Sequence, residues 1–217
     1  MTSQKAAIRW ALIVLALVLA GCMEHGAIQT SADDPQTVDG LTPTVKDKDA
    51  GRVALTPGFE ITKYKVIAVE KFPVTDAAVK DDDDRRFADK MTNVLQIELV
   101  RRLRDSKLFD QVVNAGDGNA TAGAQPTLKL QGVVTRFGRG DRALRMWVGG
   151  GAGAARTQVE MRFVDVQTGK VVMVTADRRI AKVGGGSGEL MEEAYDDMAR
   201  DLGKFLVRLS KGQAPKD

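Results

Sequence analysis

The chain has 217 residues, which is enough for one folded domain of ordinary size with short extensions. Its 32 basic and 29 acidic residues nearly balance, so the overall charge gives no electrostatic case for nucleic acid as a partner. Aromatic residues make up only 5% of the chain, which predicts an aliphatic core and argues against a surface that stacks sugars or bases.

The first 21 residues are typical of a cleavable secretory signal peptide. Lys5 and Arg9 lie in an N-terminal region without acidic residues, and an apolar run covers residues 10–20. At about 1.5 Å per helical residue this run is too short to cross about 30 Å of hydrocarbon, but it fits the apolar region of a signal. Cleavage after residue 21 lowers the formal net charge from +3 to +1, because it removes two basic residues and no acidic one.

The sequence Leu19-Ala-Gly-Cys22 resembles the bacterial lipobox, in which a cysteine after small residues is acylated before the signal peptide is removed. This resemblance implies that Cys22 begins the mature chain and that its lipid holds the protein on a membrane. Met23 stands where the inner-membrane retention signal has Asp, so we expect the outer membrane, with the domain facing the periplasm. A signal peptide without lipid, an uncleaved anchor and the inner membrane stay open as alternatives.

Residues 22–58 are predicted to be a lipidated N-terminus followed by a disordered linker. They are rich in Asp, Thr, Pro, Gly and Ala and lack apolar periodicity, so they cannot bury enough apolar surface to offset their ordering entropy. A flexible tether of this length would reach about 30–36 Å from the lipid. We therefore expect the folded domain to cover residues 59–211, followed by a C-terminal tail over 212–217.

Periodic apolar patterns within this domain predict two helices and at least four strands. Residues 84–105 and 188–210 carry apolar stripes at helical spacing, and the acidic run 81–84 suits the start of the first helix. A continuous apolar centre predicts a strand over 64–69 in the interior of a sheet. Alternation predicts further strands over 128–134, 157–163 and 171–178, and the apolar residues of 108–113 allow a short one.

The last two strands are joined by residues 165–170, with Gly169 placed for a positive φ, which predicts a hairpin. In the final strand we expect Val172, Val174 and Ala176 to face the core. Together the elements predict an α+β fold. It consists of a mixed, mostly antiparallel sheet with two helices packed on one face, preceded by the flexible tether.

Residue types that catalyse are scarce in this chain. His25 is the only histidine, and it falls in the predicted linker, where nothing can hold a general base in position. Glycines of 149–154 match a nucleotide-binding pattern, but a strand pattern rather than a helix follows them. The run 81–84 lacks the alternating ligands and the glycine of a calcium loop. We therefore predict no catalytic residue, no metal ligand and no cofactor.

The segment from Arg136 to Arg156 is the most unusual part of the chain, because it combines arginines and glycines with a tryptophan. Three interpretations stay open: a structural crossover with arginines at its rim, a loop that docks on a protein partner, or a site for an anionic glycan or lipid headgroup. The candidate partner-binding residues are Arg136, Arg139, Arg142, Arg145, Trp147 and Arg156.

Three parts of the chain are together similar to one known family. They are Gly138-Arg-Gly-Asp-Arg-Ala-Leu-Arg145 leading into Val148-Gly-Gly-Gly-Ala-Gly-Ala154, the alternating strand that follows, and Val164-Asp-Val-Gln-Thr-Gly-Lys-Val171. Over roughly residues 60 to 210 the chain resembles a bacterial envelope lipoprotein family catalogued as domain of unknown function forty-four ten. The resemblance implies a small α+β envelope domain and supplies no catalytic residues. More distantly, the order of elements looks like periplasmic domains of the curli secretion lipoprotein and of lipoprotein activators of penicillin-binding proteins.

These observations favour a non-enzymatic, membrane-anchored module that binds or assembles with an envelope protein partner in the periplasm. Two alternatives stay open. One is a subunit of an oligomeric secretion or envelope complex. The other is a carboxylate-dependent cell-wall hydrolase, which would need two carboxyl groups about 5–10 Å apart in one cleft.

Overall fold

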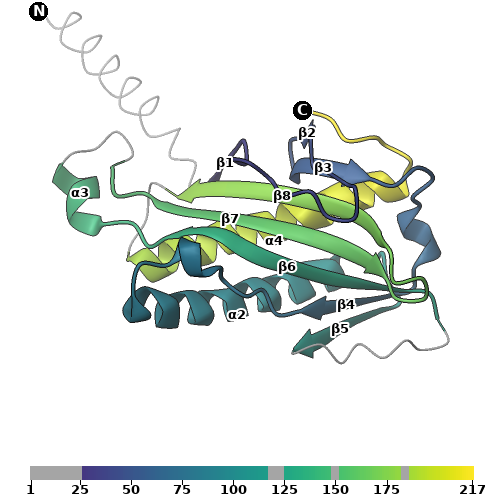
Figure 1. The fold of residues 1–217 in the computed structure, drawn as a ribbon, viewed down its shortest axis with the longest axis horizontal. Helices are drawn as coiled ribbons and strands as arrows, with labels where there is room; N and C mark the ends of the chain where they lie inside the picture. Colours follow the sequence, from purple (N-terminus) through teal and green to yellow (C-terminus); the bar gives the residue numbers. More distant parts are fainter. Residues whose placement is uncertain (1–25, 117–124, 148–151, 182–185) are drawn as a thin grey trace, which may run out of the picture.

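The structure is a computed structural model that describes residues 26–116, 125–147, 152–181 and 186–217. One eight-stranded mixed sheet carries two long helices on one face (Figure 1). The helices are α2 (Asp82–Asp105) and α4 (Ser187–Ser210), and a short helix, α3 (Arg142–Trp147), lies beyond one end of the sheet. The strands are β1 (Ile28–Thr30), β2 (Val45–Asp47), β3 (Gly51–Leu55), β4 (Val66–Glu70), β5 (Gln111–Gly116), β6 (Thr127–Gly138), β7 (Ala155–Asp165) and β8 (Val171–Ala181).

The strands β6, β7 and β8 form a long antiparallel meander at the centre of the sheet. On one side, β4 pairs in parallel with both β6 and β5. On the other side, the outer edge of β8 is shared, because residues 173–176 pair with β3 while residues 178–180 pair with β1. The strand order is β2-β3-β8-β7-β6-β4-β5, with β1 beside β8.

Both long helices bury their apolar stripes against the same face of the sheet and also pack against each other. Leu95 and Leu99 of α2 and Met198 and Phe205 of α4 are completely buried in this core. These residues belong to the predicted stripes, and each helix begins within two residues of its predicted start. The α+β fold, with a mixed, mostly antiparallel sheet and two helices on one face, is therefore confirmed.

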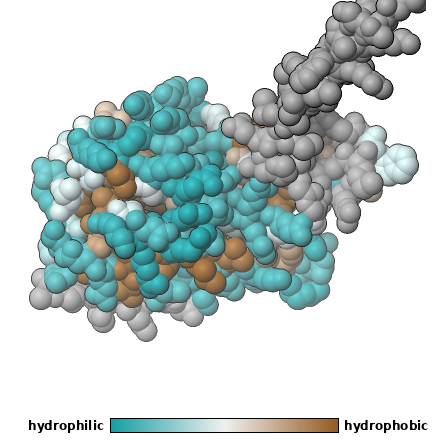
Figure 2. Space-filling view, turned by 180° about the vertical axis from the view of Figure 1, so that it is seen from behind, coloured by the Kyte–Doolittle hydropathy of each residue, from teal (hydrophilic) through white to brown (hydrophobic). Residues whose placement is uncertain are grey.

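The side of the molecule turned away in Figure 1 is mainly hydrophilic, with hydrophobic residues in small separate patches (Figure 2). This distribution is the one expected when amphipathic helices bury a single stripe and leave their other faces in water. Among the described residues, no helix combines the length and the hydropathy needed to cross a membrane.

The predicted disordered linker is wrong from residue 26 onward, because this region belongs to the sheet; residues 22–25 lie outside the described part of the chain. β1, β2 and β3 all fall before residue 58, and β1 and β3 pair with the outer edge of β8. Ala32, Ala50 and Val53 are buried there. The composition of residues 26–58 did not indicate these strands. They are attached by backbone hydrogen bonds and ion pairs to a sheet edge that residues later in the chain form.

The predicted facing of β8 is wrong at Val174 and Ala176, whereas Val172 is partly buried and packs against the core as predicted. Met173 belongs to the hydrophobic core beneath the helices, and Arg179 pairs with Asp201 of α4, so the odd-numbered positions face the helices. Val174 and Ala176 are buried on the opposite face of the sheet. Both sets of alternate residues are buried because the connection between β1 and β2 covers that opposite face, and the alternation therefore cannot tell which side is the core.

Gly132 of β6 is expected to tolerate no side chain. A Cβ there would lie 2.3 Å from the ring of Phe72 and 2.7 Å from the carbonyl oxygen of Glu160. We expect Gly132→Ala to lower the free energy of unfolding by about 1–3 kcal/mol through overpacking. Gly188→Ala is the matched control, because nothing lies within 4 Å of its Cβ position in the first turn of α4. Urea unfolding midpoints test this, and equal midpoints for the two variants would count against it.

Candidate functional site

The arginine- and glycine-rich segment 136–156 forms the connection from β6 to β7 and carries α3. At its base, the backbone N–H of Asp141 donates to the carbonyl oxygen of Gly153 at 2.8 Å. The carboxylate of Asp141 then accepts a hydrogen bond from the backbone N–H of Leu144 at 3.0 Å, in the first turn of α3. The base of the segment is therefore closed, and α3 stands beyond the end of the sheet (Figure 1).

Not all of the predicted binding residues can be placed. Residues 148–151 and the side chains of Arg142 and Arg145 lie outside the described part of the chain. The candidates whose side chains the structure describes are Arg136, Arg139, Trp147 and Arg156.

Arg139 packs on the start of α2. Its Nη1 lies 2.6 Å from an oxygen of Asp83 and 3.5 Å from one of Asp84, and its guanidinium lies 4.4 Å from the centroid of the Phe87 ring. Phe87 in turn contacts Phe137 of β6, with 5.8 Å between ring centroids. The hydrogen bond and charge of Arg139 hold the pKa of Asp83 below its ordinary value. Arg139 therefore ties the segment to the acidic end of α2.

Arg136 is also engaged within the chain. Its guanidinium lies 2.8 Å from the Asp33 carboxylate, which pairs with Arg178 of β8 at 2.7 Å. The backbone N–H of Asp33 donates to the side chain of Gln158 at 3.1 Å. Arg136 and Arg139, which the sequence predicts to contact a partner, are thus assigned by their ion pairs to holding the segment and the β1–β2 connection in place.

Trp147 and Leu144 are different, because they project from α3 into solvent. Trp147 is 86% exposed and Leu144 is 47% exposed. Arg156, at the start of β7, is also exposed. The structure therefore divides the predicted set into two anchoring arginines and an exposed group that contains the tryptophan.

A cleft of about 700 Å³ lies at the base of α3, between the starts of α2 and α4. Its carboxylates are all engaged: Asp81 caps α2, Asp84 pairs with Arg139, and Asp141 caps the first turn of α3. Among the described residues of this cleft, each carboxyl group is thus held by a hydrogen bond or an ion pair within the protein.

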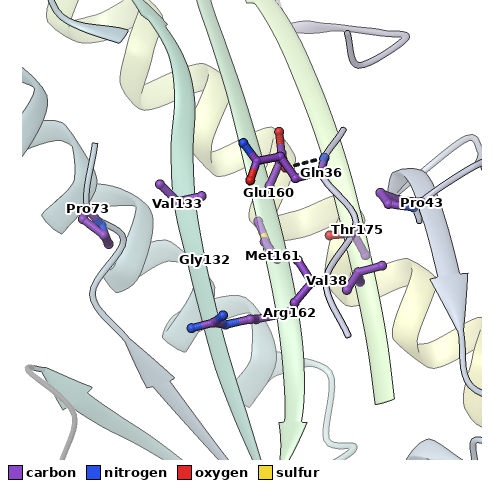
Figure 3. A pocket seen from close by; sticks show the side chains of 11 residues that line it. Gln36, Val38, Pro43, Pro73, Gly132, Val133, Glu160, Met161, Arg162 and Thr175 are labelled. Carbon is purple, nitrogen blue, oxygen red and sulfur yellow. Dashed lines mark hydrogen bonds between the residues drawn. The ribbon is translucent and has the colours of Figure 1, made fainter. Parts of the chain in front are cut away.

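A second cavity, the outer groove, lies on the sheet face opposite the helices (Figure 3). It holds about 250 Å³, and its floor is formed by β6, β7 and β8. Gln36, Val38 and Pro43 line one side, and Pro73 lines the other. The residues of the floor are Gly132, Val133, Glu160, Met161, Arg162, Val174 and Thr175.

Two charged side chains of β7 stand within this mainly apolar groove. Glu160 accepts hydrogen bonds from the backbone N–H of Gln36 at 3.0 Å and from the hydroxyl of Thr135 at 3.1 Å (Figure 3). Arg162 donates from Nε to the side chain of Gln131 at 2.9 Å. Both charges are therefore held in fixed positions, which suits recognition of a ligand with polar groups at set points.

The sequence reasoning missed a set of buried and half-buried charges beside α4, which we call the α4 ion network: Asp47, Asp49, Asp177, Arg179, Asp201 and Arg208. In its interior half, Arg179 lies 2.8 Å from an Asp177 oxygen and 3.0 Å from an Asp201 oxygen. Burial opposes the charge of Arg179, but the attraction of the two carboxylates outweighs it, so the pKa of Arg179 lies above its ordinary value. Arg179 also donates to the backbone carbonyl of Asp49 at 3.3 Å.

In the other half, Arg208 of α4 donates to both carboxylate oxygens of Asp47, at 2.7 and 2.8 Å, and to Asp49 at 2.9 Å. These contacts fasten β2 and its turn to the end of α4. The sequence signal that could have indicated such a network is Asp201, which lies one residue from Leu202 of the apolar stripe of α4 yet is buried. The pairing itself joins residues far apart in the chain, so periodicity alone cannot reveal it.

Within the described residues, no cluster of three or more His, Cys, Asp or Glu side chains is placed to hold a metal ion.

The model of the family Domain of unknown function (DUF4410) matches residues 54–185. The chain belongs to this family. The matched residues include the connection that carries α3 and the strands beneath the outer groove, and they leave out β1, β2 and α4. No curated protein matches the chain.

Several solved structures are similar to the chain at low identity. The PelC dodecamer from Paraburkholderia phytofirmans is 14% identical, with a TM-score of 0.44, covering 70% of this chain and 94% of that one. Protein XCC0632 from Xanthomonas campestris, of the family DUF330, is 15% identical, with a TM-score of 0.42 and coverage of 78% and 95%. A putative neuraminyllactose-binding hemagglutinin homolog from Helicobacter pylori is 10% identical, with a TM-score of 0.36 and coverage of 85% and 100%.

Asp47 is expected to stabilise the fold only while it is charged. Burial opposes its charge, but hydrogen bonds from the Arg208 guanidinium and from backbone N–H groups outweigh it and lower the pKa of Asp47 from 3.8. A carboxyl group whose pKa is lowered on folding contributes stability above its unfolded pKa and loses it as the pH falls through the folded value. We expect Asp47→Asn to lower the free energy of unfolding at neutral pH by about 1.5–3 kcal/mol, with a smaller deficit below about pH 4.

Urea unfolding of wild type and variant at pH 7 and at about pH 3 measures this deficit directly. The exposed Asp39 provides a control, since Asp39→Asn should change stability little at either pH. A deficit for Asp47→Asn that is the same at both pH values would contradict the assignment.

Proposed function

We propose that this protein is a lipid-anchored lipoprotein of the bacterial envelope whose periplasmic domain is a non-enzymatic binding module. The lipobox ending at Cys22 supports the anchor, and the single histidine and single cysteine of the chain support a role other than catalysis by these residue types. The observation that carries the binding role is the outer groove, which combines an apolar floor with two fixed charges.

The folded domain begins close to the proposed lipid. Gly26 follows Cys22 by four residues, which span at most about 14 Å when fully extended. The backbone N–H of Ala27 donates to the Asp197 carboxylate of α4 at 2.6 Å, and β1 then pairs with β8. A lipid at Cys22 would therefore hold the domain against the membrane, in place of the long reach that the sequence predicts.

The size and lining of the outer groove favour a protein partner. Pockets that bind drug-sized ligands and cofactors commonly hold about 300–1,000 Å³, whereas this groove holds about 250 Å³. It is large enough for a few side chains of an extended segment. Val133 and Val174 offer apolar contact, while Glu160 and Arg162 offer partners for polar groups of either charge. An envelope protein that presents such a segment fits this surface.

The anchor is tested on the mature protein purified from membranes. Mass spectrometry should show a chain that begins at Cys22 and carries acyl groups, and the protein should collect in the outer-membrane fraction of a density gradient. Cys22→Ser should carry no acyl groups. A wild-type chain that begins at another residue, or at Cys22 without lipid, would overturn the anchor.

The groove is tested by a photo-cross-linking residue placed at position 133, with position 97 as the control. Val133 lines the outer groove, whereas Ile97 is an exposed side chain of α2. In cells, an envelope protein should be captured at position 133 and not at position 97. Val133→Arg should weaken recovery of that same protein by about tenfold or more, because it places a charge in an apolar contact, while Ile97→Arg should not. Equal capture of the same protein at positions 133 and 97 would contradict the proposal.

A further inference from the structure

Three of the exposed large hydrophobic side chains, Ile28, Leu144 and Trp147, lie at one end of the molecule. Among the described residues, the large hydrophobic side chains exposed on the surface are Ile28, Val45, Ile97, Leu144 and Trp147. Leu144 and Trp147 belong to α3, and Ile28 is the first residue of β1. The register of the sheet places α3 and Ile28 at the same end.

A single row of paired residues crosses four strands at this end. Gly138 of β6 pairs with Arg156 of β7, Arg156 with Ile180 of β8, and Ile180 with Ile28 of β1. At about 4.8 Å between neighbouring strands, the root of α3 and the start of β1 are about 14 Å apart. The chain therefore enters the sheet at the same end at which α3 stands out (Figure 1).

The exposure of Trp147 is imposed by the rest of the segment. Arg139 is fixed on α2, and the Asp141–Gly153 hydrogen bond closes the base of the connection, so α3 is held away from the core. A tryptophan carries a large apolar ring and one N–H donor, and such side chains favour the interface between water and lipid. In water, the 86% exposed side chain of Trp147 can form the hydrogen bond of its N–H group, but its apolar ring stays unburied.

We propose that the α3 end, defined as Ile28, Leu144, Trp147 and Arg156, rests on the membrane that carries the lipid anchor. In this arrangement Trp147 lies in the headgroup layer. The inference rests on the proposed lipidation of Cys22, because that lipid lies within about 14 Å of Gly26 and so brings this end to the bilayer surface.

The charges at this end agree with a bilayer that contains anionic lipids. Arg156 is exposed, and the sequence adds Arg142 and Arg145 to α3. Of the nearby carboxylates, Asp83 and Asp84 share the guanidinium of Arg139, which reduces their repulsion of anionic headgroups, while Asp81 and Asp141 also lie close to this end. A protein partner would need a complementary pocket for Trp147, whereas a headgroup layer accommodates the ring without one.

Docking through α3 adds a second contact with the membrane to the one made by the anchor. A second contact on an already tethered domain works at a high effective concentration, so even a weak interface orients it. Because the row of residues at this end lies across the strands, the strands then rise from the membrane and the outer groove, near their middle, faces sideways into the periplasm.

The mature chain contains its own reporter for this contact. Trp10 lies in the predicted signal peptide, so Trp147 is the only tryptophan after cleavage. The mature lipoprotein is reconstituted into vesicles of phosphatidylethanolamine and phosphatidylglycerol, with and without bromine on the acyl chains. Trp147 emission should shift to shorter wavelength, and brominated lipid should quench most of it.

The matched control moves the tryptophan away from this end. In Trp147→Phe/Ile97→Trp, the reporter sits on α2, about 20 Å along the helix from its start, and its emission should stay water-like and unquenched. Leu144→Ser should reduce quenching of Trp147 while the urea midpoint stays at the wild-type value. Unquenched, water-like emission from wild-type protein in these vesicles would overturn the inference.

Mass spectrometry and flotation of the same sample separate this inference from the anchor. An acylated chain that floats with the vesicles but shows water-like Trp147 overturns the docking and leaves the anchor standing. A chain without acyl groups that still shows quenching supports the docking and overturns the anchor. A chain that shows neither overturns both.

Discussion

Arg179 and the two carboxylates around it are the contact on which the N-terminal part of this fold depends. Arg179 joins Asp177 on its own strand to Asp201 of α4, and it donates to the backbone at Asp49 in the turn before β3. Removing one member of such a buried set leaves a charge without compensation, which costs about 3–5 kcal/mol. The short strands β1 to β3 are thus held in place by charge as well as by backbone hydrogen bonds and by the burial of Ala50 and Val53.

Elements of the fold that depend on local contacts could be predicted from the sequence, whereas those that depend on contacts between distant residues could not. The helices and the hairpin were predictable because apolar spacing and Gly169, whose φ is +69°, are local signals. Residues 26–58 were not predictable, because β1 and β3 form against the edge of β8, and β2 forms against β3. The segment 136–156 forms one connection between β6 and β7, and its role in binding a partner stays a prediction. However, the engagement of Arg136 and Arg139 depends on Asp33 and on α2, which only the tertiary structure brings near.

The two parts of the proposed function are linked by the direction of the strands. The α3 end and the outer groove are separated along β6, with one beyond its last residue and the other at its middle. In the proposed arrangement, the short connection to the lipid fixes the height of the domain above the membrane, and the contact of α3 with the membrane fixes its orientation. The groove is then presented at a constant distance from the membrane, which suits a partner that is itself held in the envelope.

The C-terminal tail has a role at the opposite margin of the sheet. The backbone carbonyl of Lys216 accepts from Lys48 and its N–H donates to Asp47, so the tail runs beside β2, whose strand is only three residues long. Bare strand edges invite other chains to add to a sheet, and short or covered edges discourage this. The last residues therefore cover part of this edge, and in the proposed membrane-bound arrangement this cover would disfavour edge-to-edge pairing between neighbouring copies.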